Sequence, residues 1–206
     1  GTVNSLFIGI IATAIATALG TMAALGLSRP HMPYKALIMS ILISPMIVPL
    51  IITAAGMFFF YARINLVYTF TGVILAHVAL ATPFVVITVT ATLVGFDMNM
   101  VKAAQSLGAR PIRTFFKVIM PLILPGIISG ALFAFITSFD EVVIVMFMAS
   151  IDQLTIPKQM WAGIRQEISP VILCMATCLV ILSIVLLTTV ELLRRRSERL
   201  RGIKSR

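Results

Sequence analysis

Two adjacent carboxylates are the most chemically suggestive side chains in this sequence. Asp140 and Glu141 follow Thr137 and Ser138 at the end of a long apolar stretch, and another apolar run, 142–149, comes directly after them. Ionisable groups in such surroundings are costly to bury and are often functional. The pair therefore suggests a polar patch on a path for a solute. The alternative is that these carboxylates lie at the end of the apolar stretch or cap the next short helix.

The other reactive side chains do not form a recognisable catalytic or metal-binding set. His77 has only apolar neighbours one helical turn away, which favours a packed, neutral imidazole over a proton relay. Cys174 and Cys178 lie four residues apart in one apolar run, which favours buried thiols over a disulfide or a metal site. The patterns GxxxxGK[ST], HExxH and GxSxG do not occur. We therefore expect no catalytic residue, no metal site and no nucleotide-binding loop in this chain.

The composition predicts a membrane protein. Of the 206 residues, 60% are hydrophobic and 11% are charged, and the mean hydropathy is +1.09. A soluble domain of this length could not bury so much apolar surface, so lipid is the expected surrounding. The net charge of +9 would ordinarily suggest nucleic acid as a partner. Because the basic residues lie between and after the apolar segments, we expect orientation in a membrane and no nucleic acid.

Five segments are long enough to cross a bilayer as helices, which takes about 20 residues each. They cover residues 6–27, 36–61, 66–94, 121–139 and 168–190. Pro45 and Pro49 predict that the second segment is bent or broken. The expected fold is therefore a single all-α transmembrane domain over residues 1–206. A further helix before Gly1 would bring the total to six.

The basic residues predict the orientation of these segments. Thirteen of the 16 Lys and Arg residues lie on one side, in the first connection, in the connection 97–120 and in the tail 191–206. Because such residues gather on the cytoplasmic side, the connection and the C-terminal tail are expected in the cytoplasm. We interpret the tail as an anchor for the last helix.

The connection 97–120 begins with the pattern of a short helix. Residues 99–107 suit a helix that Gly108 can end by adopting a left-handed conformation. Ala103 and Leu107 share one face of it, and Ala104 lies beside them. Small residues on that face let another protein approach the backbone closely.

A second helical pattern follows in the same connection. Pro111 suits the first turn of a helix, and an apolar stripe for the membrane interface comes after it, formed by Ile112, Phe115, Phe116 and Ile119. Pro121 and Pro125 are expected to bend the chain into the fourth segment. The alternative is an irregular connection that is merely basic. Such a connection would not need two successive helical patterns, so we favour a structured connection.

These patterns carry a resemblance to a known family. Lys102-Ala103-Ala104, three residues, Gly108, nine residues and then 118–121 resembles the cytoplasmic loop signature of binding-protein-dependent ABC importer permeases. That signature reads Glu-Ala-Ala, three residues, Gly, nine residues, Ile-x-Leu-Pro. Lys102 stands where the family usually has Glu, which reverses the charge. The resemblance implies an ATPase-coupling role for six residues of this chain, namely Lys102, Ala103, Ala104, Leu107, Gly108 and Pro121.

The resemblance covers nearly the whole chain. Residues 131–143, 154–161, 163–165 and 168–170 are similar to the polyamine (spermidine/putrescine) branch, and above all to its C-type permease. It implies the six-helix, MetI-like permease fold in the bacterial inner membrane, with the first family helix missing here. It also implies a second permease subunit, two ATPase subunits that hold ATP and Mg, and an extracytoplasmic binding protein. No cofactor is expected in this chain. Trp161 suits an interfacial anchor or a contact with the binding protein.

The expected function is therefore a permease subunit of an ATP-driven importer. Polyamines are the expected substrates, because Asp140 and Glu141, with Ser138 beside them, would attract a polyammonium ion. Related branches carry amino-acid-like compounds, iron or thiamine. A proton-coupled secondary transporter would use His77 and the two carboxylates as a relay, and its uptake would be sensitive to uncouplers. A membrane enzyme is disfavoured, because no nucleophile–base pair or metal set accompanies the acids.

Overall fold

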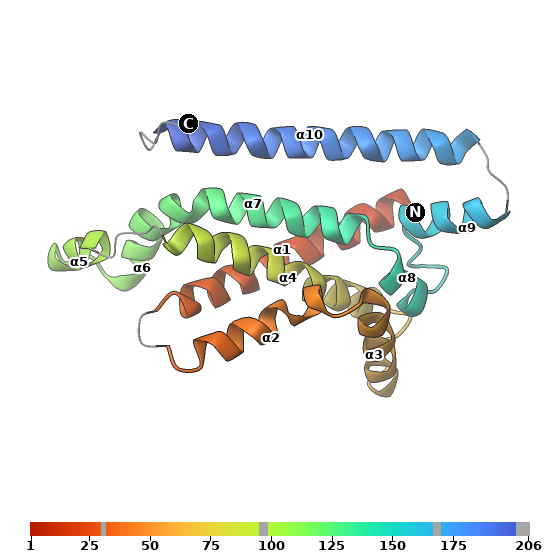
Figure 1. The fold of residues 1–206 in the computed structure, drawn as a ribbon, viewed down its shortest axis with the longest axis horizontal. Coiled ribbons are helices and arrows are strands. Elements are labelled where there is room, and N and C mark those ends of the chain that lie inside the picture. The colour runs from red at the N-terminus through yellow and green to blue at the C-terminus, as the bar shows by residue number, and fades with distance from the viewer. Residues whose placement is uncertain (30–31, 95–98, 167–169, 201–206) are drawn as a thin grey trace.

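The computed structural model describes residues 1–29, 32–94, 99–166 and 170–200 (Figure 1). Every regular element in these ranges is a helix, as the sequence predicts. In chain order they are α1 (Thr2–Leu27), α2 (Lys35–Ile47), α3 (Leu50–Arg63), α4 (Phe70–Val94), α5 (Asn99–Ser106), α6 (Pro111–Thr114), the π-helix η1 (Phe115–Ile119), α7 (Met120–Phe139), α8 (Val143–Met148), α9 (Ile156–Gln166) and α10 (Pro170–Leu200).

Helices α1, α4 and α7 form the core of the bundle. Helices α1 and α4 run in the same direction, because Phe7 contacts Phe70 near their starts and Gly20 contacts Val85 further along both. Helix α7 runs the opposite way, since its Gly130 packs on Val85 while its last turn reaches the first half of α4. The core is therefore a three-helix packing unit.

Small side chains explain how these helices approach one another. Buried small residues recur every four positions in α1 and in α7, at Ala12, Ala16, Gly20 and Ala24, and at Gly126, Gly130, Ala134 and Ser138. A Cβ atom added at Gly130 would lie 2.5 Å from Oγ1 of Thr88 and 2.9 Å from Cα of Val85. The hydrophobic effect does not drive helices together in a membrane, because lipid is as apolar as their side chains. Van der Waals contact between closely approaching backbones therefore supplies much of the packing energy.

The second predicted segment is broken, as its prolines indicate. Helices α2 and α3 meet at an angle of 103°. The break lies at Val48, whose ψ of 136° is extended, as expected for a residue that precedes a proline. Pro45, by contrast, lies inside α2. One of the two prolines therefore breaks the segment and the other is accommodated.

Within the described residues, three helical stretches are long and apolar enough to cross a bilayer, and the bent α2–α3 pair is a fourth if it counts as one span. The three are Thr2–Leu27, Phe70–Val94 and Pro111–Phe139, and α10 contains a shorter apolar stretch, Leu173–Val185. Helix α10 continues to Leu200, so the basic tail begins as part of this helix. Residues 168, 169 and 201–206 of the predicted fifth segment and tail lie outside the described residues.

The structure corrects the expectation that a separate interfacial helix precedes the fourth span. The chain is helical without a gap from Pro111 to Phe139. The π-helical turn of η1 comes directly before Met120 and Pro121, and such a turn already interrupts the regular backbone hydrogen bonds. A proline is tolerated there because the hydrogen bond it cannot donate is not needed. The helix predicted from Pro111 and the fourth span are therefore parts of one continuous helical stretch.

The predicted burial of the two cysteines is wrong in this chain. Cys174 and Cys178 are free and exposed on α10. Helix α10 lies along one side of the bundle, where its main neighbours are α7 and α9 (Figure 1). The sequence shows that this helix is apolar, but it does not show how few neighbours it has.

Candidate functional site

The two adjacent carboxylates lie at the junction between α7 and α8, which we define as residues 138–143. Helix α7 ends at Phe139, and the backbone N–H of Asp140 still donates to the carbonyl oxygen of Ile136 at 3.0 Å. The side chain of Asp140 is exposed, whereas that of Glu141 is only 7% exposed. The structure therefore gives these neighbours different surroundings.

Glu141 caps helix α8. Its Oε1 atom accepts the backbone N–H of Ile144 at 2.9 Å. Burial raises the pKa of the Glu141 carboxyl, the backbone N–H groups of Ile144 and Val143 lower it in part, and the neighbouring Asp140 raises it again. Of the alternatives that the sequence left open for the pair, helix capping describes Glu141.

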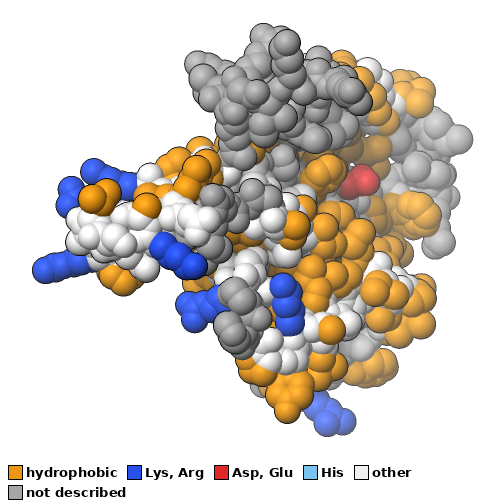
Figure 2. Space-filling model, turned by 60° about the vertical axis from the view of Figure 1, so that its left-hand side comes forward, with side chains coloured by type: hydrophobic (Ala, Val, Ile, Leu, Met, Phe, Trp, Pro, Cys, Tyr) orange, Lys and Arg blue, Asp and Glu red, His pale blue; other side chains and the backbone are white. Residues whose placement is uncertain are grey.

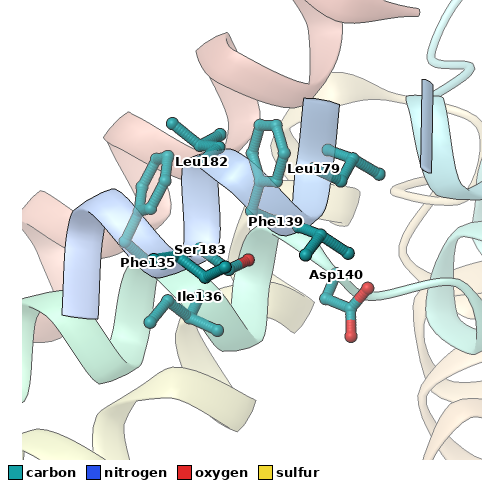
Figure 3. Close-up of a pocket in the computed structure, with 9 residues that line it drawn as sticks. Phe135, Ile136, Phe139, Asp140, Leu179, Leu182 and Ser183 are labelled. Carbon is teal, nitrogen blue, oxygen red and sulfur yellow. The ribbon is translucent and has the colours of Figure 1, made fainter. Parts of the chain in front are cut away.

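Asp140 lines two cavities. One, of about 270 Å³, lies between α7 and α10. In Figure 3 the Asp140 carboxylate lies at one end of this cavity, and the stacked rings of Phe135 and Phe139, 5.3 Å apart, stand along it with Leu179 and Leu182. The other cavity, of about 480 Å³, is lined by both carboxylates. Its remaining walls are formed by Leu50, Ile136, Thr137, Val142 and Val143. A carboxylate beside largely apolar walls suits a cation that carries a hydrocarbon chain.

Ser138 belongs to a helix contact. Its Oγ atom lies 2.8 Å from Nδ1 of His77, and this hydrogen bond joins α7 to α4. Both side chains are buried, at 5% and 1% exposure. The imidazole is therefore packed, as its apolar neighbours predicted, but it has a polar partner 61 positions away in the sequence. No local pattern could have found that partner.

The short helix that the sequence predicts in the connection 97–120 is present, at the opposite end of the bundle from Asp140 and Glu141. Helix α5 projects beyond the core at the end away from α8 and α9 (Figure 1). Gly108 has a φ of +79°, so the predicted left-handed stop is confirmed. The N–H of Gly108 bonds to the carbonyl of Gln105 at 2.9 Å, and that of Ala109 bonds to the carbonyl of Ala104 at 3.0 Å. This paired arrangement is the Schellman motif, which satisfies the last carbonyls of a helix.

The surface of α5 and of the turn after it is open. Lys102, Ala103 and Gly108 are exposed, Leu107 is 89% exposed, and Ala104 is half-buried. Pro121 lies apart from these residues, in the first turn of α7. Figure 2 shows Lys and Arg side chains gathered at this end of the molecule, and the exposed basic residues near α5 are Lys102, Arg110, Arg113 and Lys117. Leu107 is therefore an exposed apolar side chain with basic side chains around it.

The remaining predicted residues are placed as follows. Trp161 lies on α9, is 48% exposed and sits at the end of the bundle that carries α8. Within the described ranges, no group of three or more His, Cys, Asp or Glu residues could hold a metal ion. Figure 1 shows the end of α1, the start of α2, α5 and the end of α10 at one end of the bundle. The basic segments that the sequence assigned to one side therefore do lie together.

Comparisons with known proteins agree on one family. The family model described as "Binding-protein-dependent transport system inner membrane component" matches residues 16–199. The spermidine/putrescine transport system permease protein PotC of Haemophilus influenzae is 29% identical over 196 residues, which cover 95% of this chain and 76% of PotC. The putrescine transport system permease protein PotI of Escherichia coli K12 is 37% identical over 103 residues, 50% of this chain and 37% of PotI.

A further relative and two solved structures extend the comparison. The trehalose transport system permease protein SugB of Mycobacterium tuberculosis is 32% identical over 148 residues, 72% of this chain and 54% of SugB. An inward-facing structure of the MetNI methionine ABC transporter matches with a TM-score of 0.74 at 17% identity, covering 94% and 93% of the two chains. An amino acid ABC transporter matches with a TM-score of 0.69 at 20% identity, covering 95% and 92%. These structures show the fold.

Proposed function

Because this chain belongs to the family of binding-protein-dependent transport system inner membrane components, which are ABC importer permeases, we propose that it carries polyamines such as putrescine and spermidine. It is a transport subunit of the inner membrane and not an enzyme. The permeases named for spermidine and putrescine support the choice of substrate. The match to a permease named for trehalose shows that another branch is also similar, so the substrate needs its own argument.

That argument rests on the exposed carboxylate of Asp140. It lines two cavities, and the pair of stacked phenylalanine rings lies beside it in the smaller one. The other walls of the smaller cavity are largely apolar, and those of the larger one combine apolar side chains with Thr137 and Glu141. A polyamine combines ammonium groups with methylene segments, so its charges and its apolar surface both find a counterpart here. A neutral sugar carries no positive charge to pair with the carboxylate. Glu141 adds less to the attraction, because its carboxylate is buried and bonded to the backbone of α8.

We further propose that α5 docks on an ATPase subunit. Leu107 and Ala103 would enter a groove on that subunit, and Gly108 would hold the end of the helix in the docking shape. The exposure of these residues and the projection of α5 beyond the core support this role. In this proposal α5 and the basic C-terminal tail face the cytoplasm, and ATP with Mg binds only to the ATPase subunits.

The remaining partners follow from the same proposal. A second permease subunit would complete the transport path, and lipid or that subunit would cover the apolar side chains that α2 and α3 expose, such as Ile47, Ile51 and Phe59. An extracytoplasmic binding protein would deliver the substrate at the end that carries α8 and α9, with Trp161 as one contact. Ser138 supports the path indirectly, through its bond to His77.

Uptake into proteoliposomes tests the proposal. The chain would be reconstituted with its partner permease, its ATPase subunits and its binding protein, and uptake of radiolabelled putrescine would be compared with that of trehalose and methionine. We expect ATP-dependent uptake of putrescine that persists with an uncoupler. An Asp140→Asn change should raise the KM for putrescine at least tenfold, since an interaction with a charged group contributes about 1.5–3 kcal/mol and about 1.4 kcal/mol corresponds to tenfold. The exposed Asp152 offers the matched control, because Asp152→Asn should leave uptake unchanged. Uptake of trehalose alone would overturn the polyamine proposal.

A further inference from the structure

Helix α8 is held at both ends by charged side chains from outside it. Its six residues are too few for a stable helix on their own. At its N-terminus Glu141 accepts the N–H of Ile144 at 2.9 Å. At its C-terminus the Nζ atom of Lys158 donates to the carbonyl oxygens of Val145 and Ala149, at 3.2 and 3.0 Å. The negative group lies at the positive end of the helix dipole and the positive group at the negative end, so both contacts are favourable.

The C-terminal end of α8 is also tied to the rest of the bundle. The backbone N–H of Tyr68, just before α4, donates to the carbonyl oxygen of Met148 at 2.9 Å. The loop between α8 and α9 is fastened to α1, because Asn4 donates to the carbonyl oxygens of Asp152 and Leu154 at 2.7 and 3.0 Å.

Helix α9, which carries Lys158, is fastened to α1 at its first residue. The N–H of Ile156 donates to Oγ of Ser5 at 2.8 Å. Lys158 is therefore carried by a helix, α9, that is bonded to α1 independently of α8.

The position of α8 determines one wall of the larger cavity beside Asp140. Val142, just before α8, and Val143, its first residue, line that cavity together with Asp140 and Glu141. On its other side α8 is buried in the bundle, since Ile144, Val145 and Met148 are 0% exposed. A shift of α8 would therefore move the cavity wall relative to the carboxylate.

We infer that Lys158 and Glu141 are positioning residues: they hold α8 so that the cavity formed by α7, Val142 and Val143 keeps Asp140 available to a cationic substrate. Lys158 acts through the backbone of α8 and does not touch the substrate. Its bonds to two carbonyl groups also keep its positive charge on the α8 backbone, where it does not compete for the carboxylate. The inference rests on the proposed transport of a cation.

Transport kinetics separate positioning from a general structural role. Lys158→Met removes the donors, Lys158→Gln keeps an N–H donor without the charge, and Lys35→Met alters an exposed lysine at the start of α2 as the control. We expect Lys158→Met to raise the KM for putrescine at least fivefold, with the maximal rate per assembled complex within twofold of wild type. Lys158→Gln should recover at least half of this loss, and Lys35→Met should change neither parameter. A fall in the maximal rate with an unchanged KM would overturn the inference.

A double-mutant cycle tests whether Lys158 acts through Asp140. If it does, adding Lys158→Met to Asp140→Asn should raise the KM by less than twofold, since the carboxylate that needs positioning is already gone. Two independent, multiplying effects would contradict the inference. If the Lys158→Met protein does not assemble, the KM of Lys158→Gln decides. A KM close to that of wild type supports a role for the bonds to α8, and a KM as high as that of Asp140→Asn refutes the inference.

Thiol labelling tests the same geometry without any transport. In a Cys174→Ser, Cys178→Ser background, the Val143→Cys variant would be labelled in detergent with a cationic and an anionic methanethiosulfonate reagent. We expect the cationic reagent to react at least threefold faster, and this ratio should fall toward one with Asp140→Asn or Lys158→Met but not with Lys158→Gln. An unchanged ratio in Lys158→Met would overturn the inference. The expected labelling in a protein that moves no polyamine would overturn only the proposed function.

Discussion

Replacing Gly108 with alanine isolates the backbone contribution to docking of α5. The φ of +79° is unfavourable for an L-residue, and a Cβ atom added at Gly108 would meet no other atom within 4 Å. The substitution therefore has no steric cost against neighbouring groups, and its whole effect comes from the left-handed conformation. That conformation costs a residue with a Cβ atom about 1–2 kcal/mol.

The expected effect on docking follows from that cost. If the ATPase binds α5 only when the helix ends as observed, a cost of 1–2 kcal/mol lowers the affinity of the ATPase about 5- to 30-fold. Asparagine tolerates the left-handed region better than alanine, so Gly108→Asn should lose less than Gly108→Ala. The affinity would be measured by titrating the purified ATPase onto the permease complex in nanodiscs. Putrescine uptake per ATP hydrolysed would be measured in parallel.

Gly56 provides the matched control for this experiment. It lies inside α3, and a Cβ atom added there also meets nothing within 4 Å, but its φ is not in the left-handed region. Gly56→Ala should therefore leave the affinity of the ATPase unchanged, and alanine is favoured over glycine within a helix. The reasoning is refuted if Gly108→Ala binds the ATPase as wild type does, or if Gly108→Asn binds it more weakly than Gly108→Ala.

Two further changes test the packing of the core, each by thermal unfolding of the purified protein in detergent. Gly130→Ala would press a methyl group onto α4, 2.9 Å from Cα of Val85, and should destabilise the protein by about 1–3 kcal/mol, whereas Gly26→Ala, where nothing lies within 4 Å, should not. A Gly130→Ala protein as stable as wild type would show that α4 and α7 are further apart than described. His77→Ala should cost about 1–3 kcal/mol because it leaves the buried Ser138 hydroxyl without this partner. Adding Ser138→Ala should cost less than the two single changes sum to, and strict additivity would argue against their hydrogen bond.

Features that depend on a few consecutive residues could be predicted from the sequence. The left-handed end of α5 follows from glycine at position 108, because no other residue adopts that conformation as easily. The break between α2 and α3 follows from proline chemistry, and so does the extended conformation of Val48 before Pro49. Proline chemistry alone did not identify which proline breaks the helix, since Pro45 remains inside α2.

Predictions that assumed regular local structure were less accurate. The fourth span was expected to start near Pro121, but a π-helical turn accommodates the proline and the helix continues from Pro111. The cysteines of α10 were expected to be buried because the segment is apolar, yet burial depends on how many neighbours a helix has. Hydropathy identifies a side chain that avoids water, and it does not distinguish lipid from protein as its surrounding.

The sequence by itself determined that the chain is helical and apolar, that its basic residues gather on one side, and that a short helix ends at Gly108. Each of these depends on residue type and near-neighbour spacing. Only the tertiary structure decided that Glu141 caps α8 while its neighbour Asp140 faces two cavities. It alone paired His77 with Ser138 and brought Lys158 to the end of α8. The physical reason is that these roles depend on backbone groups and side chains from other segments, whose proximity exists only after the helices pack.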